Sequence, residues 1–394
     1  MCEESQILLV RRGCYPAPMK RELELELIRR ALDNISNKTS DSAGEPFGVP
    51  VERYLSETVL AAERRLLRQR PVVVAFASQV AEPGSVVVHD HAGVPVLVTR
   101  TKDGELHAFF NACRHRGTKI ALEGCSAADK LVCPYHGWSY DLSGRLRGVP
   151  HRGEFSGVDL AAKNLVELPV WTHAGLVLTR MTAGPSEDLA LGALPQDLES
   201  FGFGDHVLFG ASVRERPLNW KLMLDGSWET YHFRTTHDKT IAPFFFDNTG
   251  VFDWDAPNLR MVLPKRSILE LRDAGTRSWH IRPHANLIYS LFPNTIVLVQ
   301  PDHAMVLTLW PTAVDRTVIA AGMLVPEAPS SDKAVEHWHK NEQIFWDAIE
   351  EDLDMGARIQ ATLASGANPE LLCGRSEHLI GKYRAELDRA LFVA

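Results

Sequence analysis

The sequence predicts an α+β protein, in which a small antiparallel β domain precedes a larger domain with a helix-flanked antiparallel β-sheet. Short β-branched runs separated by Gly, Pro and Asp-Gly turns fill residues 71–172, a texture typical of a compact β domain. Helical and strand-like stretches then mix between residues 173 and 394. A chain of 394 residues is long enough for two or three domains with buried cores.

The N-terminal part is predicted to be helical. Residues 18–35 and 55–70 are charge-rich stretches typical of helices, and the intervening residues 36–50 are rich in Ser, Asn and Gly, as in a linker. We therefore expect a helical extension with a linker at 1–54, a lead-in helix with the β domain at 55–172, and the larger domain at 173–394.

The strands of both domains are predicted from their β-branched runs. In the small domain these runs are Val72–Val74, Val86–Val88, Val96–Thr99, Leu106–Phe110, Leu131–Val132 and Val166–Leu168. In the larger domain they cover 258–271, 278–291, 295–300, 304–311 and 316–324. Helices are expected at 217–234 and at 333–364, with Gly366 just past the end of the second as a stop signal.

Composition excludes several classes of function. The net charge of −8 argues against nucleic acid as a main partner, because phosphate binding needs clustered Lys and Arg. No apolar run reaches the ~18 residues that a membrane-spanning helix needs. The first residues lack the order of a secretory signal, so we expect a cytoplasmic protein, where paired cysteines favour metal binding over disulfides.

Two loops of the β domain carry metal-ligating residues in pairs. Cys113 and His115 form the first pair, Cys133 and His136 form the second, and a Gly follows each His closely. Two thiolates and two imidazoles suit a [2Fe–2S] cluster in which the histidines bind one iron. The same four residues are also an acceptable tetrahedral zinc set, so spacing alone leaves both metals open.

The larger domain carries a second candidate site. Glu229 and His232 are three residues apart and share one helical face, whereas His237 follows five residues later, about 140° further round an ideal helix. The helix must bend or end between the histidines if both bind one metal. The alternative is a pair of helix histidines that bind carbonyl groups or water.

A third ligand is expected on the helix at 333–364. Asp352 is the one charged residue on an apolar face that also carries Phe345, Ala348 and Ile349. Its carboxylate needs a cation or donor, either a metal held with His232 and His237 or the side chain of an Arg or Lys. The neighbouring acids Asp347, Glu350, Glu351 and Asp354 are expected to be solvated.

The flanks of both sites resemble one family. CRHRG and CPYHGWSYDLSGRL resemble the cluster loops of Rieske proteins, and Thr118 and Tyr135 stand where respiratory Rieske proteins have a cysteine pair. The NWK stretch from Asn219, with its E-x-Y-H-x4-H ending, resembles the α subunits of ring-hydroxylating oxygenases. The resemblance runs from about residue 55 to the C-terminus.

This resemblance implies cofactors and residue roles. Cys113, His115, Cys133 and His136 would hold a [2Fe–2S] cluster, and His232, His237 and Asp352 would hold mononuclear Fe(II). Glu229 would bridge electrons from His136 of a neighbouring subunit, in a closed ring of three identical subunits. Asp225 would be a further catalytic carboxylate; many aromatic-ring members have Asn directly after it, where this chain has Gly226.

The implied activity is that of a terminal oxygenase. It would use O2 and electrons from an NAD(P)H-dependent reductase, directly or through a ferredoxin, to hydroxylate, dihydroxylate or demethylate a small organic molecule. An aromatic or heteroaromatic substrate is expected first, with Phe244–Phe246, Trp228 and Phe292 as candidate pocket residues. The alternatives are the same chemistry on a quaternary amine or natural-product intermediate, or a Rieske electron-transfer protein without enzymatic activity.

Overall fold

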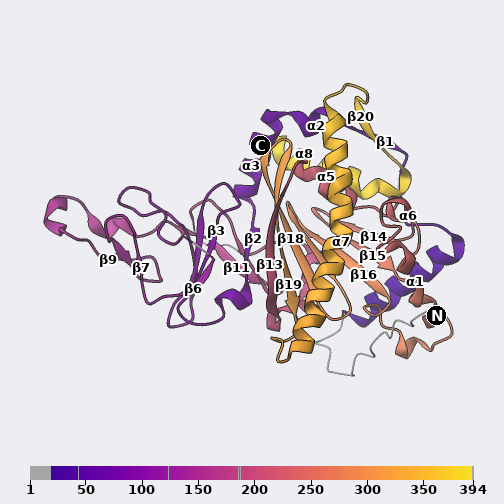
Figure 1. Cartoon of the computed structure of the whole chain (residues 1–394), viewed down its shortest axis with the longest axis horizontal. Helices are drawn as coiled ribbons and strands as arrows, with labels where there is room; N and C mark the ends of the chain where they lie inside the picture. Colours follow the sequence, from indigo (N-terminus) through magenta and orange to yellow (C-terminus); the bar gives the residue numbers. More distant parts are fainter. Residues whose placement is uncertain (1–18, 43, 123, 185, 187, 393–394) are drawn as a thin grey trace.

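The protein is described by a computed structural model that covers residues 19–392 except 43, 123, 185 and 187. A seven-stranded antiparallel sheet forms the centre of its larger part, with smaller sheets extending to one side (Figure 1). The strand order is β13-β19-β18-β17-β16-β15-β14, so strands consecutive in the chain are neighbours from β14 to β19. Their bounds are β13 Val207–Arg216, β14 Val251–Asp255, β15 Asn258–Pro264, β16 Ala285–Leu291, β17 Thr295–Val299, β18 Ala304–Ala313 and β19 Arg316–Val325.

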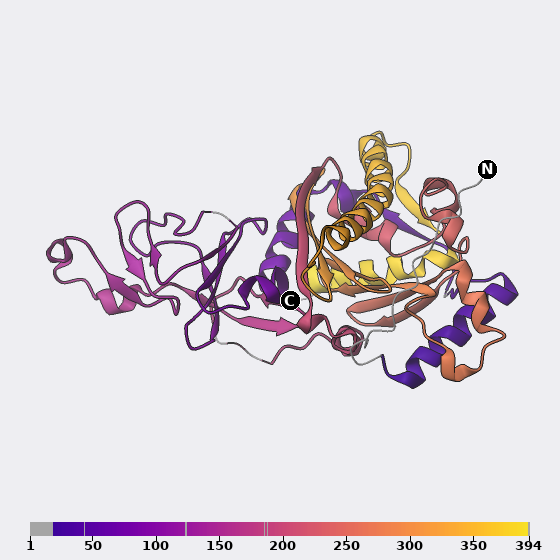
Figure 2. The ribbon, with the colours of Figure 1, turned by 60° about the horizontal axis from the view of Figure 1, so that its bottom comes forward.

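Both faces of this sheet are buried, in two different hydrophobic cores. Alternate residues of a strand point to opposite faces, so Ile296 joins one core and Val297 the other. The first core also holds residues of α5 (Trp220–Ser227), α7 (Asp332–Leu363) and α8 (His378–Phe392). The second core includes α1 (Arg21–Asn37), which contacts β14 and β15. Figures 1 and 2 show α7 lying along the first face of the sheet.

The small β domain contains three sheets. Five strands run in the order β10-β5-β4-β3-β6, three in the order β11-β12-β2, and three in the order β7-β8-β9. Their bounds are β2 Val72–Phe76, β3 Ser85–His89, β4 Val96–Arg100, β5 Leu106–Phe110, β6 Cys125–Ala127, β7 Leu131–Val132, β8 Ser139–Tyr140, β9 Leu146–Gly148, β10 Glu167–Leu168, β11 Val170–His173 and β12 Leu176–Thr179. Both views place β7 and β9 at the end of the molecule away from the seven-stranded sheet.

The predicted helices form, with altered bounds. The stretch at 55–70 becomes α2 (Glu52–Leu55) and α3 (Glu57–Gln69), because the Ser56 side chain caps α3 by accepting from the amide of Val59. The long helix α7 begins after Ser331, whose hydroxyl accepts from the amide of Ala334. Gly366 follows its end with φ +75°, a conformation that favours glycine.

Part of the predicted linker at 36–50 is instead a strand. Residues Phe47–Pro50 form β1, which pairs antiparallel with β20 (Glu370–Cys373). The pairing partner lies more than 300 residues away in the chain, so local composition could not reveal it. The predicted strands 258–271 and 278–291 are also shorter, because 3₁₀ turns occupy Arg266–Leu271 and Thr276–Ser278.

Candidate functional site

The two cysteine–histidine loops have the same backbone turn. The amide of Gly117 donates to the carbonyl of Cys113 at 2.9 Å, and the amide of Gly137 donates to that of Cys133 at 3.0 Å. These glycines have φ of +79° and +67°, so a side chain at either position would strain the turn. Each turn therefore contains both the Cys and the His of its own loop.

Burial separates the thiols from the imidazoles. Cys113 and Cys133 are each only 3% exposed, whereas His136 lies at the surface. The rings of His115 and His136 are 4.6 Å apart, centroid to centroid, and His115 stacks on Trp138 at 5.0 Å. The two imidazoles therefore lie together, and both thiols belong to the hydrophobic cluster that also holds Trp138.

The donor set of these loops fits a [2Fe–2S] cluster. Nδ1 of His115 is buried and has no hydrogen-bond partner among the described residues, as expected of a ligand atom. The Tyr140 hydroxyl lies 3.4 Å from Sγ of Cys113 and accepts from the amide of Arg114. Buried sulfurs with a hydrogen-bond donor nearby, and imidazoles outside them, are what a Rieske cluster needs.

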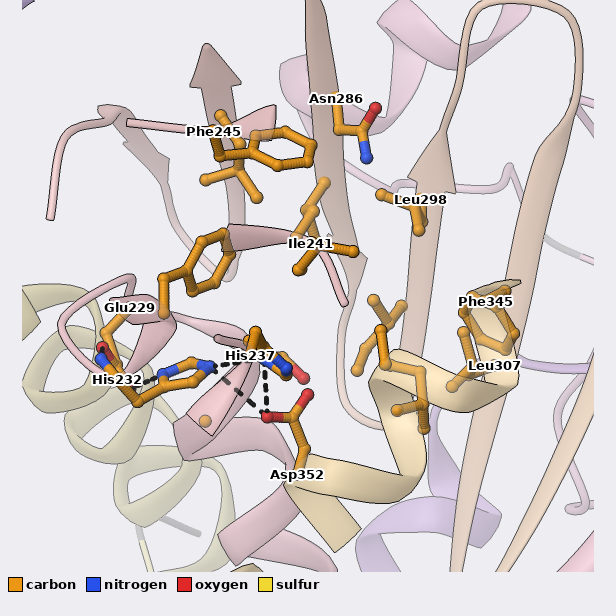
Figure 3. A pocket seen from close by; sticks show the side chains of 18 of the residues that line it. Glu229, His232, His237, Ile241, Phe245, Asn286, Leu298, Leu307, Phe345 and Asp352 are labelled. Carbon is orange, nitrogen blue, oxygen red and sulfur yellow. Dashed lines mark hydrogen bonds and ion pairs between the residues drawn. The ribbon is translucent and has the colours of Figure 1, made fainter. Parts of the chain in front are cut away.

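The second site lies where a broken helix meets α7. The predicted helix at 217–234 is two pieces, α5 and α6 (Phe233–Thr236), joined by a turn that contains Glu229. α6 itself ends at Thr236, between His232 and His237, as the spacing of the two histidines requires if both bind one metal. Asp352 approaches both from α7 (Figure 3).

The three side chains converge on one point. Nε2 of His232 lies 3.2 Å from Nε2 of His237, and Oδ1 of Asp352 lies 3.3 Å and 3.1 Å from these nitrogens. Ligands bound at about 2.1 Å from one metal ion are separated by roughly 3.0–3.4 Å. Two imidazoles and one carboxylate on one side of a metal are the facial set of non-haem Fe(II) oxygenases.

Each histidine is oriented by its own carboxylate. Oε1 of Glu229 contacts Nδ1 of His232, and Oε2 of Glu351 lies 2.7 Å from Nδ1 of His237 and accepts from Thr240 at 2.6 Å. These contacts leave both Nε2 atoms free to face the metal position. The expectation that Glu351 is solvated is wrong. The position of Glu351 directly beside Asp352 on the same helix is the sequence signal that could have revealed its contact with His237.

Charge favours a cation at this site. Burial raises the pKa of Asp352, but hydrogen bonds from His232 and His237 outweigh it and hold the pKa below its ordinary value. Burial lowers the pKa of His232, but Asp352 and Glu229 raise it to about 10. Three carboxylates, those of Glu229, Glu351 and Asp352, surround the two imidazoles. Among the described residues, Asp352 contacts the two histidines and no Arg or Lys, so the alternative of an Arg or Lys partner finds no support.

A largely apolar cavity of about 120 Å³ opens beside the three converging side chains (Figure 3). Its walls come from α5, α6, the sheet and α7, including Ile288 and Phe345. Of the aromatic residues proposed from sequence to line a pocket, Phe245 does so. Phe244 is instead 64% exposed, and Trp228 and Phe292 belong to the hydrophobic core.

Asp225 lies beside the pocket wall and is engaged elsewhere. Its Oδ1 accepts from Nη2 of Arg384 at 2.6 Å, and its Oδ2 accepts from the hydroxyl of Tyr54 at 2.6 Å. Gly226 and Ser227 line the cavity, but Asp225 does not. Its predicted catalytic role stays a prediction, and the structure adds Arg384 and Tyr54 as partners that sequence reasoning missed.

The two parts of the chain match two known families. Residues 70–169 match the Rieske [2Fe-2S] domain, and residues 203–391 match the ring hydroxylating alpha subunit (catalytic domain). The chain belongs to the Rieske oxygenase α subunits. It therefore carries a Rieske [2Fe–2S] domain and a catalytic domain that binds mononuclear iron, which sets the zinc alternative aside.

Relatives of this oxygenase subunit include mono- and dioxygenases. The glycine betaine monooxygenase oxygenase subunit of Pseudomonas aeruginosa is 24% identical over 72% of this chain and 75% of the relative. Four other matches span 42–57% of the relative's length, whereas the carnitine monooxygenase oxygenase subunit of Escherichia coli is 27% identical over 82% of this chain and 85% of the relative. Among the described residues, every helix is too short or too polar to span a membrane.

Solved structures share the fold. One is a quaternary ammonium Rieske monooxygenase studied for carnitine oxidation by gut microbiota and inter-subunit electron transfer; it has a TM-score of 0.72 and 22% identity, over 89% of this chain and 96% of that one. Naphthalene 1,2-dioxygenase from Rhodococcus has a TM-score of 0.72 and 17% identity, over 95% of this chain and 99% of that one.

Proposed function

We propose that the protein is the terminal oxygenase component of a Rieske system, which uses O2 to hydroxylate, dihydroxylate or demethylate a small organic substrate. The observation that carries the proposal is the convergence of His232, His237 and Asp352 beside an apolar cavity. An aromatic or heteroaromatic substrate and a quaternary amine both agree with the relatives found.

The residues divide into two metal sites. Cys113, His115, Cys133 and His136 hold the [2Fe–2S] cluster, while His232, His237 and Asp352 hold Fe(II). When bound, these groups supply single electrons and a site for O2. The protein's own part is to fix both imidazoles through Glu229 and Glu351, and to exclude water from the substrate with apolar walls.

Electrons are proposed to pass between subunits. The loop of Cys133 and His136 follows β7, at the end of the molecule away from the iron site (Figure 1). His136 is exposed there, so a neighbouring copy can approach it. Inter-subunit transfer is described for a protein of the same fold. We therefore propose a homotrimer in which His136 of one subunit reaches Glu229 of the next.

The wider setting follows from this chemistry. An NAD(P)H-dependent reductase, directly or through a ferredoxin, reduces the cluster in the cytoplasm, where NAD(P)H is available. The division of the chain into an extension at 1–54, a cluster domain with its lead-in helix at 55–172 and a catalytic domain at 173–394 stays a proposal, with one change. Because β12 (Leu176–Thr179) pairs with β2, the cluster domain extends to residue 179.

Metal analysis separates this function from a simple electron carrier. We expect about three irons and two sulfides per chain, with the His232→Ala variant losing about one iron and keeping the cluster absorption. NADH-dependent oxygen uptake with a reductase should then depend on an added organic compound. Two irons per chain, unchanged in His232→Ala, would favour the electron carrier. A colourless preparation without sulfide would contradict both.

Glu229 is proposed to connect the two metals. Glu229→Gln keeps a hydrogen-bond acceptor for Nδ1 of His232 but removes the negative charge, so both metals should stay bound while cluster-to-iron electron transfer slows sharply. Rapid-mixing absorption of the reduced cluster in single turnover measures that rate. Normal turnover in the variant would refute the path.

A further inference from the structure

Two amide side chains, those of Asn286 and Gln300, line the cavity at one end of the pairing between β16 and β17. Leu287 of β16 pairs with Val299 of β17, and Asn286 and Gln300 directly adjoin this pair in the chain. Because alternate residues share a face, Asn286 lies on the face of Ile288, and Gln300 on that of Leu298. All four side chains line the cavity. Figure 3 shows the amide of Asn286 across the cavity from His232, His237 and Asp352.

The amide of Asn286 lacks a partner. Its Oδ1 is buried and accepts no hydrogen bond within the described chain. An unsatisfied buried polar atom costs about 1–3 kcal/mol, so such atoms are usually paired in the working state of a protein. The amide of Gln300 adds a second donor and acceptor in the wall of the same cavity, and the pair keeps both kinds of group whichever way each amide is turned.

The charges of the cavity restrict what binds between these amides and the metal position. No Lys or Arg is among its described lining residues, so a substrate carboxylate would find no cationic side chain to pair with at the wall away from the metal position. The aromatic rings that line it, apart from the two histidines, are those of Phe233, Phe245 and Phe345, which bind quaternary ammonium groups less strongly than Trp does. The acids Glu229 and Asp352 are already engaged with the two histidines.

We infer that Asn286 and Gln300 select a neutral substrate with a compact apolar body and one group that both donates and accepts hydrogen bonds, such as an amide, a lactam or a phenol. The inference rests on the proposed oxygenase function and names the substrate class of the same pocket. The amides hold the polar group at the far wall, which turns the apolar end of the molecule toward His232, His237 and Asp352.

Binding of matched benzene derivatives to the holoenzyme tests this inference. Benzamide, benzoate, toluene and phenyltrimethylammonium are similar in size but differ in charge and hydrogen bonding. Calorimetry without reductant should give a dissociation constant for benzamide at least about tenfold below those for benzoate and phenyltrimethylammonium. Tighter binding of benzoate or of the ammonium ion would overturn the inference.

Variants of Asn286 and Gln300 test whether their amides cause the selectivity for a neutral, hydrogen-bonding ligand. Asn286→Leu keeps the size of the side chain and should weaken benzamide binding about tenfold while changing toluene binding less than threefold. The control Ile288→Leu, on the same face, should change both ligands equally. Equal losses for both ligands in Asn286→Leu would overturn the assignment. Gln300→Leu provides a second variant if Asn286→Leu fails to keep its iron and cluster absorption.

The same titrations keep the two proposals distinct. Calorimetry needs no turnover, so selective benzamide binding together with an absence of any substrate-dependent oxygen uptake would support the pocket assignment and contradict the oxygenase. Oxygen uptake that is fastest with charged compounds would support the oxygenase and overturn the pocket assignment.

Discussion

At the residue scale, three consecutive acids of α7 have different partners at and around the iron site. Asp352 faces the two Nε2 atoms, and Glu351 holds Nδ1 of His237 from behind. Glu350, one residue earlier, points to Arg214 and Arg216 on β13 and has no contact with the histidines. Successive helix residues are turned by about 100°, so three consecutive acids reach three different surroundings.

This arrangement predicts a positioning role for Glu351. Glu351→Ala should raise the dissociation constant for iron about 10–100-fold, because His237 loses the group that fixes its ring. Glu351→Gln should recover part of the loss, since its amide oxygen still accepts from Nδ1. Chelator competition measures the effect, with cluster absorption as a check on folding.

Glu350→Gln is the matched control for the Glu351 variants. It removes a charge from the same helix turn but leaves His237 untouched, so iron affinity should not change. If Glu350→Gln lowered iron affinity as much as Glu351→Ala, the effect would reflect general helix charge and not the contact with His237.

At the element scale, a buried ion pair joins the lead-in helix to α5, the helix whose last residues line the cavity. Nζ of Lys221 on α5 lies 2.7 Å from Oε1 of Glu63 on α3, and Nε1 of Trp220 donates to the other oxygen at 2.8 Å. Both charged side chains are almost fully buried. Burial lowers the pKa of Lys221 to about 8, although Glu63 opposes the shift.

Removing only one charge of this pair should lower the stability of the protein far more than removing both charges. Lys221→Met leaves a buried carboxylate without its cation and should cost about 3–5 kcal/mol of stability. Adding Glu63→Gln should recover much of this, because the amide oxygen still accepts from Trp220. Denaturant unfolding of the four proteins of this double-mutant cycle measures the coupling. Additive effects would show that the two side chains do not interact.

At the scale of the whole molecule, a buried histidine lies between the cluster domain and the catalytic sheet. The ring of His89, at the end of β3, is 4.9 Å from the ring of Trp310 on β18, centroid to centroid. His89 is 7% exposed, and Nε2 has no partner among the described residues. Burial and the nearby His91 lower its pKa to about 3.

This contact predicts a loss of stability in mild acid. Because the pKa of His89 is about 3 in the folded chain and 6.5 ordinarily, only the unfolded chain takes up the proton as the pH falls below 6.5. Stability should therefore decrease progressively from pH 6.5 toward pH 3. His89→Leu should flatten this dependence of the melting temperature.

The matched control for the acid effect is His339→Leu. The side chain of His339 is 63% exposed, so its loss should leave the pH dependence unchanged. A pH dependence that is the same in His89→Leu as in the unchanged protein would show that other groups cause the acid sensitivity.

The sequence by itself determined the candidate metal ligands and most of the elements. Three features follow from short-range geometry. They are the ligand spacing within each loop, the bend or end of the helix between His232 and His237, and the apolar helix face that carries Asp352. The structure places His232, His237 and Asp352 within reach of one metal ion and the rings of His115 and His136 beside each other. Strands β3 and β4 were predictable because they are strongly β-branched, and helix α7 because its pattern is long.

Only the tertiary structure decided the features that depend on distant partners. The pairing of β1 with β20 and the contact of Glu351 with His237 each join residues that are far apart in the chain. The presence of both Asn286 and Gln300 in the wall of one cavity likewise depends on how the chain folds. Local propensity carries no information on such contacts, because burial and register are set by the whole sheet. The motifs of this oxygenase therefore predict its chemistry, whereas the shape and polarity of its substrate pocket depend on the fold.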